Sequence, residues 1–539
     1  MSLVEVRDLS VEFASGVRGV DGLSFALEAG GALALVGESG SGKSTVASAL
    51  LGLHRGTGAR VTGTVRVDGI DVQEASEAEL RRLRGGKAAM VFQDPLSSLD
   101  PYYAVGDQIA EVYRVHTGAS RRAARARAVD VLGRVGIPDA ARRSRSRPHE
   151  FSGGMRQRTL IAMALACEPA LLIADEPTTA LDVTVQAQIL DLLHTLRDET
   201  GMGLLLVTHD VGVAAQSADE VLVMRGGRAV ERGAVRDVLA APREAYTREL
   251  LGAVPRVDAP LLTPSRDVGG GEGEDEFVLE AVGLRREFGR GKRAVTAVDD
   301  VSLGVRRGET LGVVGESGSG KTTLGRMLVG LLEPSAGRLL HEGAERPGGR
   351  VDPKVQMVFQ DPVSSLNPRR SIGESIADPL RARGESDTFV RGRARELLER
   401  VGLEPAHYDR YPHEFSGGQR QRVGIARALA AEPRIIVCDE PVSALDVTTQ
   451  AQVVALLAEL RRELGLALVF IAHDLAVVRQ VSDRVAVMRR GRIVEYGNVD
   501  EVYGSPRDPY TRQLLAAVPS LDPEAAARRR TARGELAAV

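Results

Sequence analysis

The sequence contains only two cysteines, Cys167 and Cys438, and they stand far apart. Neither lies in a Cys-x-x-Cys pair or a Cys/His cluster, so the sequence predicts no disulfide, zinc site or iron–sulfur site. No apolar run approaches the ~20 residues that a helix needs to cross a bilayer. The N-terminus also lacks the charged, apolar and small-residue pattern of a signal peptide. The sequence therefore predicts an intracellular protein that is soluble or peripheral to a membrane.

Lysine is scarce, and the chain has no basic excess. Its formal net charge is −3, which argues against a general nucleic-acid binder. The run Arg528-Arg529-Arg530 is interpreted as a solvated end in preference to a nucleic-acid contact. The 70 basic residues include five lysines, Lys43, Lys87, Lys292, Lys321 and Lys354. Two of these five lysines, Lys43 and Lys321, stand at the same place in a repeated motif.

The chain of 539 residues is a duplication. Gly-Glu-Ser-Gly-Ser-Gly-Lys, Phe-Ser-Gly-Gly, Asp-Glu-Pro and His-Asp each occur twice. Lys43 and Lys321 lie 278 residues apart, and Gln93 and Gln360 lie 267 apart. A constant spacing of 264 residues separates the later pairs, which are Ser152 and Ser416, Glu176 and Glu440, His209 and His473, and Pro255 and Pro519. Length differences are thus confined to the front of each copy.

The repeat predicts one domain over 1–255 and a second over 277–519. Residues 256–276 are Pro-rich and then Gly/Glu-rich, which predicts a flexible linker. Residues 520–539 are predicted to form a frayed or helical tail. Each copy ends in a Tyr-Thr-Arg segment that runs to Ala-Val-Pro, at 246–255 and 510–519. Each half is long enough to bury an α/β core.

Each copy places a glycine-rich loop between a strand and a helix. Apolar runs at 32–36 and 311–314 predict buried parallel strands, and helical character follows the first loop over 46–53. In the pattern G-x-x-x-x-G-K-[ST], backbone N–H groups converge on phosphate, the lysine reaches the β- and γ-phosphates, and the hydroxyl binds Mg²⁺. The predicted nucleotide-binding residues are Gly37, Glu38, Ser39, Gly40, Ser41, Gly42, Lys43, Ser44 and Thr45 in the first copy and Gly315, Glu316, Ser317, Gly318, Ser319, Gly320, Lys321, Thr322 and Thr323 in the second.

Each copy also contains an apolar run that ends in two acids, Asp175-Glu176 and Asp439-Glu440. The first carboxylate of each pair is predicted to hold Mg²⁺ through its water shell. The second is predicted to polarise the attacking water, because phosphoryl transfer needs mainly positioning and charge stabilisation. A histidine follows each glutamate by 33 residues, and we expect His209 and His473 to contact the γ-phosphate rather than to be structural.

Residues 151–158 (Phe-Ser-Gly-Gly-Met-Arg-Gln-Arg) and 415–422 (Phe-Ser-Gly-Gly-Gln-Arg-Gln-Arg) resemble the signature motif of ATP-binding-cassette ATPases. With the P-loops, glutamine loops, Asp-Glu pairs and histidines, the resemblance covers nearly the whole chain. It implies an α/β fold of two tandem P-loop NTPase cassettes. Each cassette would have a RecA-like α/β core, an antiparallel β subdomain and an α-helical signature subdomain, and would hydrolyse ATP with Mg²⁺.

The resemblance also implies that each ATP lies between the P-loop of one cassette and the signature of the other. One site would combine Lys43, Glu176 and His209 with Ser416-Gly417-Gly418. The other would combine Lys321, Glu440 and His473 with Ser152-Gly153-Gly154. A Ser-Gly-Gly segment that opens a helix offers a hydroxyl, N–H groups and a positive helix end to a γ-phosphate.

The resemblance also implies roles for the glutamine loops and for two aromatic residues, and it shows one position where this sequence differs from the family pattern. Gln93 and Gln360 would sense the γ-phosphate and join the metal ligands Ser44, Asp175, Thr322 and Asp439. Phe13 and Phe288 would stack on adenine, and Asp182 and Asp446 match the loop that crosses between cassettes. Met155 replaces the usual glutamine but leaves the Ser-Gly-Gly donors intact, so two working sites are expected.

Several details resemble the oligopeptide/dipeptide/nickel importers. These are the Gln-Asp-Pro…Ser-Ser-Leu loops at 93–101 and 360–368, the Pro-His-Glu-Phe segments before the signatures, and the terminal extensions. The resemblance implies two membrane permeases and an extracytoplasmic binding protein as partners, with this chain at the cytoplasmic face of the membrane. The Arg-rich stretch 121–147 would belong to the helical subdomain that meets the permeases, or form a solvated helix face. Peptides, nickel complexes and glutathione-like compounds all stay open as the solute.

Three other classes of ATPase are compared with this interpretation. Ribosome-associated tandem ATPases share the motifs but carry a long, charged, helical connector, whereas 256–276 is short and Gly-rich. Sugar-importer ATPases usually lack the Gln-Asp-Pro loops and the terminal extensions. Tandem excision-repair ATPases need cysteine clusters, which this sequence does not have.

Overall fold

A computed structural model describes residues 2–179, 181–257, 277–289, 294–346, 351–361, 365–443, 445–522 and 524–530. The chain divides into two compact units, one of Met1–Val254 with Pro519–Val539 and one of Pro255–Val518. We call them unit 1 and unit 2 and describe each by itself. The predicted linker over 256–276 lies almost wholly outside the described residues. The described part of the predicted tail is helical over 524–530.

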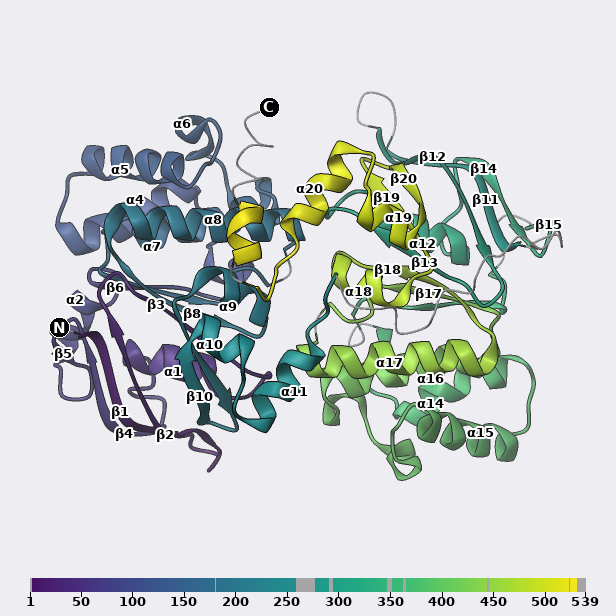
Figure 1. The fold of residues 1–539 in the computed structure, drawn as a ribbon, viewed down its shortest axis with the longest axis horizontal. Helices are drawn as coiled ribbons and strands as arrows, with labels where there is room; N and C mark the ends of the chain where they lie inside the picture. Colours follow the sequence, from purple (N-terminus) through teal and green to yellow (C-terminus); the bar gives the residue numbers. More distant parts are fainter. Residues whose placement is uncertain are drawn as a thin grey trace. The chain divides into compact units, whose positions relative to one another are not determined.

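Two sheets form unit 1 (Figure 1). One has four antiparallel strands in the order β2-β1-β4-β5, and the other has six strands in the order β10-β9-β3-β8-β7-β6. Neighbours in the larger sheet pair in parallel, except that β10 is antiparallel to β9. The strands are β1 Ser2–Glu12, β2 Arg18–Glu28, β3 Ala32–Val36, β4 Arg60–Val67, β5 Ile70–Asp71, β6 Ala88–Val91, β7 Leu171–Asp175, β8 Gly203–Thr208, β9 Glu220–Arg225 and β10 Arg228–Ala234.

The central strands of unit 1 are buried on both faces. In β3, Leu33 and Leu35 pack into a core with β1, β2, β4 and α1, whereas Ala34 and Val36 pack into a second core with helices α4, α5, α7 and α8. This alternation is the period of two that a covered parallel strand requires. The helices are α1 Lys43–Leu50, α2 Glu77–Leu83, α3 Pro95–Ser98, α4 Val105–Thr117, α5 Arg121–Arg134, α6 Ala140–Arg143, α7 Gly153–Leu165, α8 Val183–Thr200, α9 Val211–Ser217, α10 Val235–Ala240 and α11 Ala245–Ala253.

Unit 2 repeats this architecture, with sheets in the orders β12-β11-β14-β15 and β16-β17-β18-β13-β19-β20. Its strands are β11 Phe277–Phe288, β12 Val295–Arg306, β13 Thr310–Val314, β14 Ala336–His341, β15 Ala344–Glu345, β16 Val355–Val358, β17 Ile435–Asp439, β18 Ala467–Ile471, β19 Arg484–Arg489 and β20 Arg492–Asn498. Its helices are α12 Lys321–Val329, α14 Ile372–Ala382, α15 Asp387–Arg400, α16 Gly417–Ala430, α17 Val447–Leu464, α18 Leu475–Val481, α19 Val499–Gly504 and α20 Pro509–Ala517.

The α/β architecture predicted from the motifs is confirmed, and the predicted strand at 32–36 is β3. The helix after the first glycine-rich loop begins earlier than the predicted 46, at Lys43, and ends at Leu50. Gly42 has a φ of 97° and precedes the helix directly, so the helix starts at the lysine itself. Within the described residues, no helix combines the length and apolar character needed to span a bilayer.

Helix α17 offers a matched pair of leucines that tests the buried core of unit 2. Leu457 is 2% exposed and Leu464 is 43% exposed. We expect Leu457→Ala to lower the free energy of unfolding by about 2–5 kcal/mol, because it removes buried methyl groups and leaves a cavity. Leu464→Ala is expected to change it by less than about 1 kcal/mol, because the side chain is already half in solvent. Urea unfolding followed by circular dichroism measures both, and equal losses would contradict the packing of α17.

Candidate active site

The P-loop lysine of each unit is buried and bonded to its own loop. Lys43 Nζ donates to the carbonyl oxygens of Gly37 and Glu38, both at 2.8 Å, and lies 3.3 Å from Ser41 Oγ. In unit 2, Lys321 Nζ donates to Gly315 and Glu316 at 2.7 and 2.9 Å. The ammonium group is therefore fixed inside the loop whose N–H groups are expected to bind phosphate.

The first glycine of each loop packs against the end of a neighbouring strand. A Cβ at Gly37, which has a φ of 152°, would lie 2.2 Å from the carbonyl oxygen of Met224 in β9. The same distance separates a Cβ at Gly315 from the Met488 carbonyl oxygen in β19. Only glycine allows this approach, so β9 and β19 set where each P-loop begins.

The first carboxylate of each Asp-Glu pair contacts the hydroxyl that follows the lysine. Ser44 Oγ donates to Asp175 Oδ1 at 3.0 Å, and Thr322 Oγ1 donates to Asp439 Oδ1 at 3.0 Å. Burial raises the pKa of Asp175 to about 6, and the adjacent Glu176 charge acts in the same direction. Burial likewise raises the pKa of Asp439. Burial disfavours the charged form of each aspartate, and a cation bound beside it would stabilise that form. The neighbouring hydroxyl offers a second oxygen ligand.

The second carboxylate of unit 1 is the centre of a network. Glu176 accepts from Gln93 Nε2 at 2.9 Å and from Thr179 Oγ1 at 2.8 Å, and its Oε1 lies 3.2 Å from His209 Nδ1. Its backbone has a φ of 47°, a conformation that is strained for a residue with a side chain. The three predicted residues Gln93, Glu176 and His209 are therefore brought together by the fold.

Unit 2 repeats this network. Glu440 accepts from Gln360 Nε2 at 2.9 Å and lies 3.2 Å from His473 Nδ1, and its φ is 45°. Ser443 replaces the threonine of unit 1, and its hydroxyl donates to the Glu440 backbone carbonyl at 3.2 Å instead of to the carboxylate. Glutamine, glutamate and histidine are thus brought together in both units, while the hydroxyl support and the carboxylate oxygen that faces the histidine differ.

Each glutamate–histidine pair favours its charged form. Burial acts to raise the pKa of Glu176, but the hydrogen bond and charge of His209 outweigh it and hold the pKa below its usual value. Burial acts to lower the pKa of His209, and Glu176 reverses this effect and raises it. The directions are the same for Glu440 and His473. A carboxylate kept ionised can accept a proton from, or orient, a water molecule.

The signature residues open helices in both units. Ser152 Oγ accepts from Met155 N at 3.4 Å at the start of α7, and Ser416 Oγ accepts from Gln419 N at 3.3 Å at the start of α16. Gln419 Oε1 also accepts from Ser416 N at 3.0 Å, and this reciprocal bond completes a capping box. Methionine at position 155 has no such acceptor. Asp182 and Asp446 cap the following helices α8 and α17.

The two glycines of each signature face different surroundings. A Cβ at Gly154 would lie 2.4 Å from Val185 Cγ1 in α8, and one at Gly418 would lie 2.2 Å from Thr449 Cγ2 in α17. A Cβ at Gly153 would lie 3.7 Å from Leu181, an ordinary contact. The second glycine is therefore required for the packing of its helix against the next helix. At the first glycine there is room for a methyl group.

The predicted adenine-stacking aromatics differ in their surroundings. The Phe13 ring lies edge-on to His54, with centroids 5.9 Å apart, and His54 Nε2 lies 3.0 Å from the Thr45 carbonyl oxygen in the P-loop helix. Phe288 is 42% exposed, and the Arg286 guanidinium lies 5.0 Å from its ring centroid. Sequence reasoning did not single out His54 or Thr179, because no repeated motif marks either residue.

These folds and sites define an ABC ATPase. Residues 20–179 and 298–443 match the sequence model of the ABC transporter family, and residues 230–272 and 494–539 match the C-terminal region of oligopeptide/dipeptide transporters. The chain belongs to the ABC transporter family and is an ATP-binding subunit whose ATP hydrolysis is coupled to transport. The family resemblance found in the sequence is confirmed, and the ribosome-associated and sugar-importer alternatives are not supported.

Curated relatives match along nearly the whole chain. The glutathione import ATP-binding protein GsiA of Salmonella typhimurium, Escherichia coli O157:H7 and Shigella sonnei is 46% identical, over 97% of this chain and 90% of each relative. Among solved structures, cbiO1 from Clostridium perfringens is 29% identical with a TM-score of 0.39, over 43% of this chain and 92% of its own. The dimeric bacterial ABC transporter cassette MJ0796 is 30% identical with a TM-score of 0.38, over 41% of this chain and 98% of its own.

The signature glycines of α7 give a matched test of the packing between α7 and α8. Gly154→Ala is expected to lower the free energy of unfolding by about 1–3 kcal/mol, because its methyl group overlaps Val185. Gly153→Ala has room for its methyl group and is expected to destabilise the protein less. Calorimetric melting of the two variants measures the difference. Equal melting temperatures would contradict the close approach of Gly154 to α8.

Proposed function

We propose that this chain energises a solute importer through two ATP sites that both hydrolyse. The observation that carries the proposal is the convergence of glutamine, glutamate and histidine on one point in each unit, with a P-loop lysine in the same unit. Two complete sets of groups indicate two working sites rather than one working and one degenerate site. The same arrangement suits phosphoryl transfer to water, which depends on positioning and charge stabilisation.

In this proposal each residue of the network has a separate role. Lys43 and Lys321 neutralise the β- and γ-phosphates of ATP. Glu176 and Glu440 orient the attacking water and accept its proton, which their ionised state allows. In unit 1, His209 contacts one carboxylate oxygen of Glu176 and Gln93 donates to the other from a separate loop. In unit 2, Gln360 and His473 contact the same oxygen, Oε2 of Glu440.

The cation is proposed to be Mg²⁺, held by Ser44 and Asp175 in unit 1 and by Thr322 and Asp439 in unit 2, with Gln93 and Gln360 nearby. One hydroxyl and one carboxylate, completed by phosphate oxygens and water, form a donor set that Mg²⁺ favours. Within the described residues, no group of three or more His, Cys, Asp or Glu side chains is arranged to hold a metal. When bound, the ion would neutralise charge that develops on the phosphates.

The prediction that each signature completes the nucleotide site of the other cassette stays part of this proposal. Within unit 1, the described contacts of Ser152-Gly153-Gly154 are with α7, Leu181 and α8, and a phosphate is proposed to bind at the start of α7. Ser416-Gly417-Gly418 starts α16 in the same way. The predicted adenine contacts of Phe13 and Phe288 and the crossing role of Asp182 and Asp446 also stay predictions.

The proposed solute is glutathione or a short peptide. The relatives that match 97% of this chain are named for glutathione import, and both copies end in the oligopeptide/dipeptide region. The proposed partners are two membrane permeases and an extracytoplasmic binding protein. The chain itself would bind at the cytoplasmic face of the membrane as a peripheral subunit.

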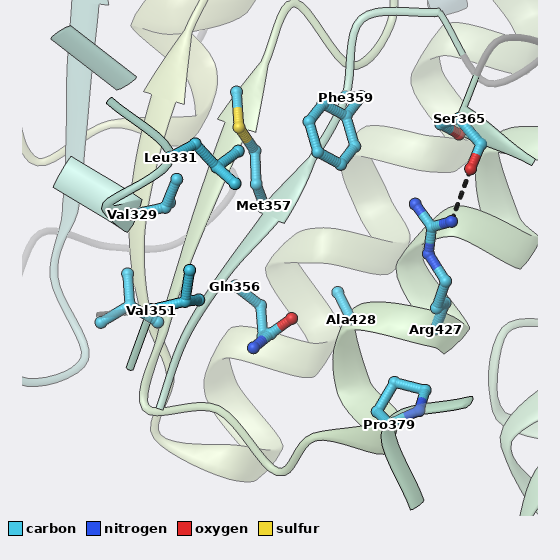
Figure 2. A pocket seen from close by; sticks show the side chains of 11 residues that line it. Val329, Leu331, Val351, Gln356, Met357, Phe359, Ser365, Pro379, Arg427 and Ala428 are labelled. Carbon is cyan, nitrogen blue, oxygen red and sulfur yellow. Dashed lines mark hydrogen bonds between the residues drawn. The ribbon is translucent and has the colours of Figure 1, made fainter. Parts of the chain in front are cut away.

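A pocket in unit 2 suits a permease segment (Figure 2). It has a volume of about 430 Å³ and lies where β16 meets α14 and α16. Leu331 and Val351, which are 52% and 55% exposed, line it with Met357 and Phe359. Exposed apolar side chains in a hollow favour a buried apolar partner. Arg427, whose Nη1 donates to the Ser365 carbonyl at 2.6 Å, supplies the polar wall.

Turnover of the isosteric glutamine variants tests the catalytic assignment. The double variant Glu176→Gln/Glu440→Gln is expected to lower kcat for ATP by about 10²- to 10⁴-fold, because it removes the proposed proton acceptor from both sites. Each single variant should retain turnover from the intact site, and MgATP binding should persist. Phosphate release and nucleotide titration measure these effects. Glu199→Gln, at a surface glutamate paired with Arg134, serves as the control. Full turnover in the double variant would refute the assignment.

Co-purification from membranes tests the proposed partners and the pocket together. The tagged chain, extracted in mild detergent, is expected to bring down two polytopic permeases. Leu331→Glu should reduce their recovery several-fold, because a charge would be buried in an apolar contact. Leu464→Glu, at an exposed leucine of α17 outside the pocket, should leave recovery unchanged. Recovery of ribosomes in place of permeases would overturn the proposal. If the Leu331→Glu variant recovers as much permease as the unmodified chain, the pocket is not part of the permease interface.

A further inference from the structure

The Tyr-Thr-Arg segments that close both copies have no role in the network described so far. Tyr246 lies in α11 and Tyr510 in α20, and both are buried, at 5% and 2% exposure. Both fall within the residues that match the C-terminal region of oligopeptide/dipeptide transporters. Their hydroxyl groups nevertheless reach the P-loop.

Each tyrosine hydroxyl accepts a hydrogen bond from the backbone of the second P-loop residue. The Glu38 N–H donates to Tyr246 Oη at 3.3 Å, and the Glu316 N–H donates to Tyr510 Oη at 3.0 Å. In unit 1 the two residues are 208 positions apart in the sequence. The contact recurs in both copies.

The same peptide group is also held by the P-loop lysine. The Glu38 N–H and the Gly37 carbonyl belong to one peptide unit, and Lys43 Nζ donates to that carbonyl at 2.8 Å. In unit 2, Lys321 Nζ donates to the Gly315 carbonyl at 2.7 Å. One peptide is thus bound at its N–H by the tyrosine and at its oxygen by the lysine.

The tyrosine ring is fixed from a second side. The Arg225 guanidinium lies 4.6 Å from the Tyr246 ring centroid, and Arg489 lies 4.7 Å from that of Tyr510. These distances are typical of cation–π contacts. Arg225 ends β9 directly after Met224, the residue whose carbonyl touches Gly37. The strand, the ring and the start of the P-loop therefore form one contiguous contact.

The helix that carries the tyrosine is tied to the sheet at its start. The Glu231 carboxylate in β10 accepts from the backbone N–H groups of Arg243 and Glu244 at 2.9 and 3.2 Å. The Glu495 carboxylate in β20 accepts from Arg507 and Asp508 at 2.8 and 3.2 Å. Two charge-assisted bonds per helix limit how far the tyrosine can move relative to the loop.

We propose that Tyr246 and Tyr510 are positioning residues for ATP binding. Each hydroxyl fixes the peptide that orients the P-loop lysine, so that the C-terminal extension pre-orders the loop before ATP binds. Pre-ordering lowers the conformational cost of binding and so raises affinity. The inference rests on the proposed role of the P-loops and adds the extension as a part of each nucleotide site.

Removal of the hydroxyl alone tests this proposal in the full-length chain. In a Lys321→Ala background, where the Lys43 site binds nucleotide, Tyr246→Phe is expected to raise the Kd for MgATP about two- to tenfold, the effect of one lost hydrogen bond. Tyr510→Phe should do the same in a Lys43→Ala background. With both lysines present, the double Tyr→Phe variant should raise KM for ATP and leave kcat unchanged, because the glutamate networks are intact.

Tyr503→Phe is the matched control for a loss of stability. The Tyr503 hydroxyl donates to the Leu475 carbonyl at 2.8 Å rather than to a P-loop. Its removal should lower the melting temperature without changing the Kd for MgATP. If Tyr246→Phe and Tyr510→Phe behave in the same way, the tyrosines are only structural and the inference is wrong. Failure of the lysine backgrounds themselves to bind MgATP would instead overturn the proposed nucleotide sites, and the inference with them.

Discussion

Three parallel strands of unit 1 end at one edge of the sheet, and their register fixes the site. Val36 at the end of β3 pairs with Thr208 of β8, and Asp175 at the end of β7 pairs with Val207 of the same strand. The P-loop, the Asp-Glu pair and His209 follow directly from these ends. Because a slip of one residue turns every side chain to the opposite face, this register is the constraint on which the network depends. Side chains buried on both faces of β3 oppose such a slip.

Two adjacent carboxylates at the end of β7 repel each other when both are charged. Their surroundings shift their pKa values in opposite directions. Burial raises the pKa of Asp175, whereas Glu176, one residue later, keeps a lowered pKa because His209 and Lys43 compensate its charge. The backbone of Glu176 is left-handed, with a φ of 47°. The Asp175 carboxylate turns to the hydroxyl of Ser44 and that of Glu176 to Gln93 and His209. Opposed environments of this kind are how neighbouring acids acquire different roles.

The sequence was sufficient to place the buried strands that precede the motifs and to list the glutamine, glutamate and histidine that the fold brings together, because duplication shows which spacings are kept. The antiparallel strands were not placed from the sequence. It was not sufficient for Thr179, His54 or Tyr246. The contacts of the Thr179 and His54 side chains depend on where those side chains point, which sequence periodicity does not reveal. The Tyr246 segment was visible as a repeated motif, yet its partner lies 208 residues away, and only the packing of α11 against the P-loop brings the two together. The helix after the first P-loop was placed three residues late because a left-handed Gly42 lets it start at Lys43.

The two signatures differ at the residue after Ser-Gly-Gly, which is Met155 in unit 1 and Gln419 in unit 2. Gln419 closes a reciprocal capping box with Ser416, whereas Met155 packs against the apolar core of unit 1 and offers no acceptor to Ser152. The hydroxyl of Ser152 still caps α7, and Gly154 still packs against α8. Among the described contacts, the reciprocal bond from the N-cap N–H to the side chain three residues later is present at Ser416 and not at Ser152. The replacement therefore alters how the start of α7 is held, while the Ser-Gly-Gly residues that we propose to contact phosphate are present in both units.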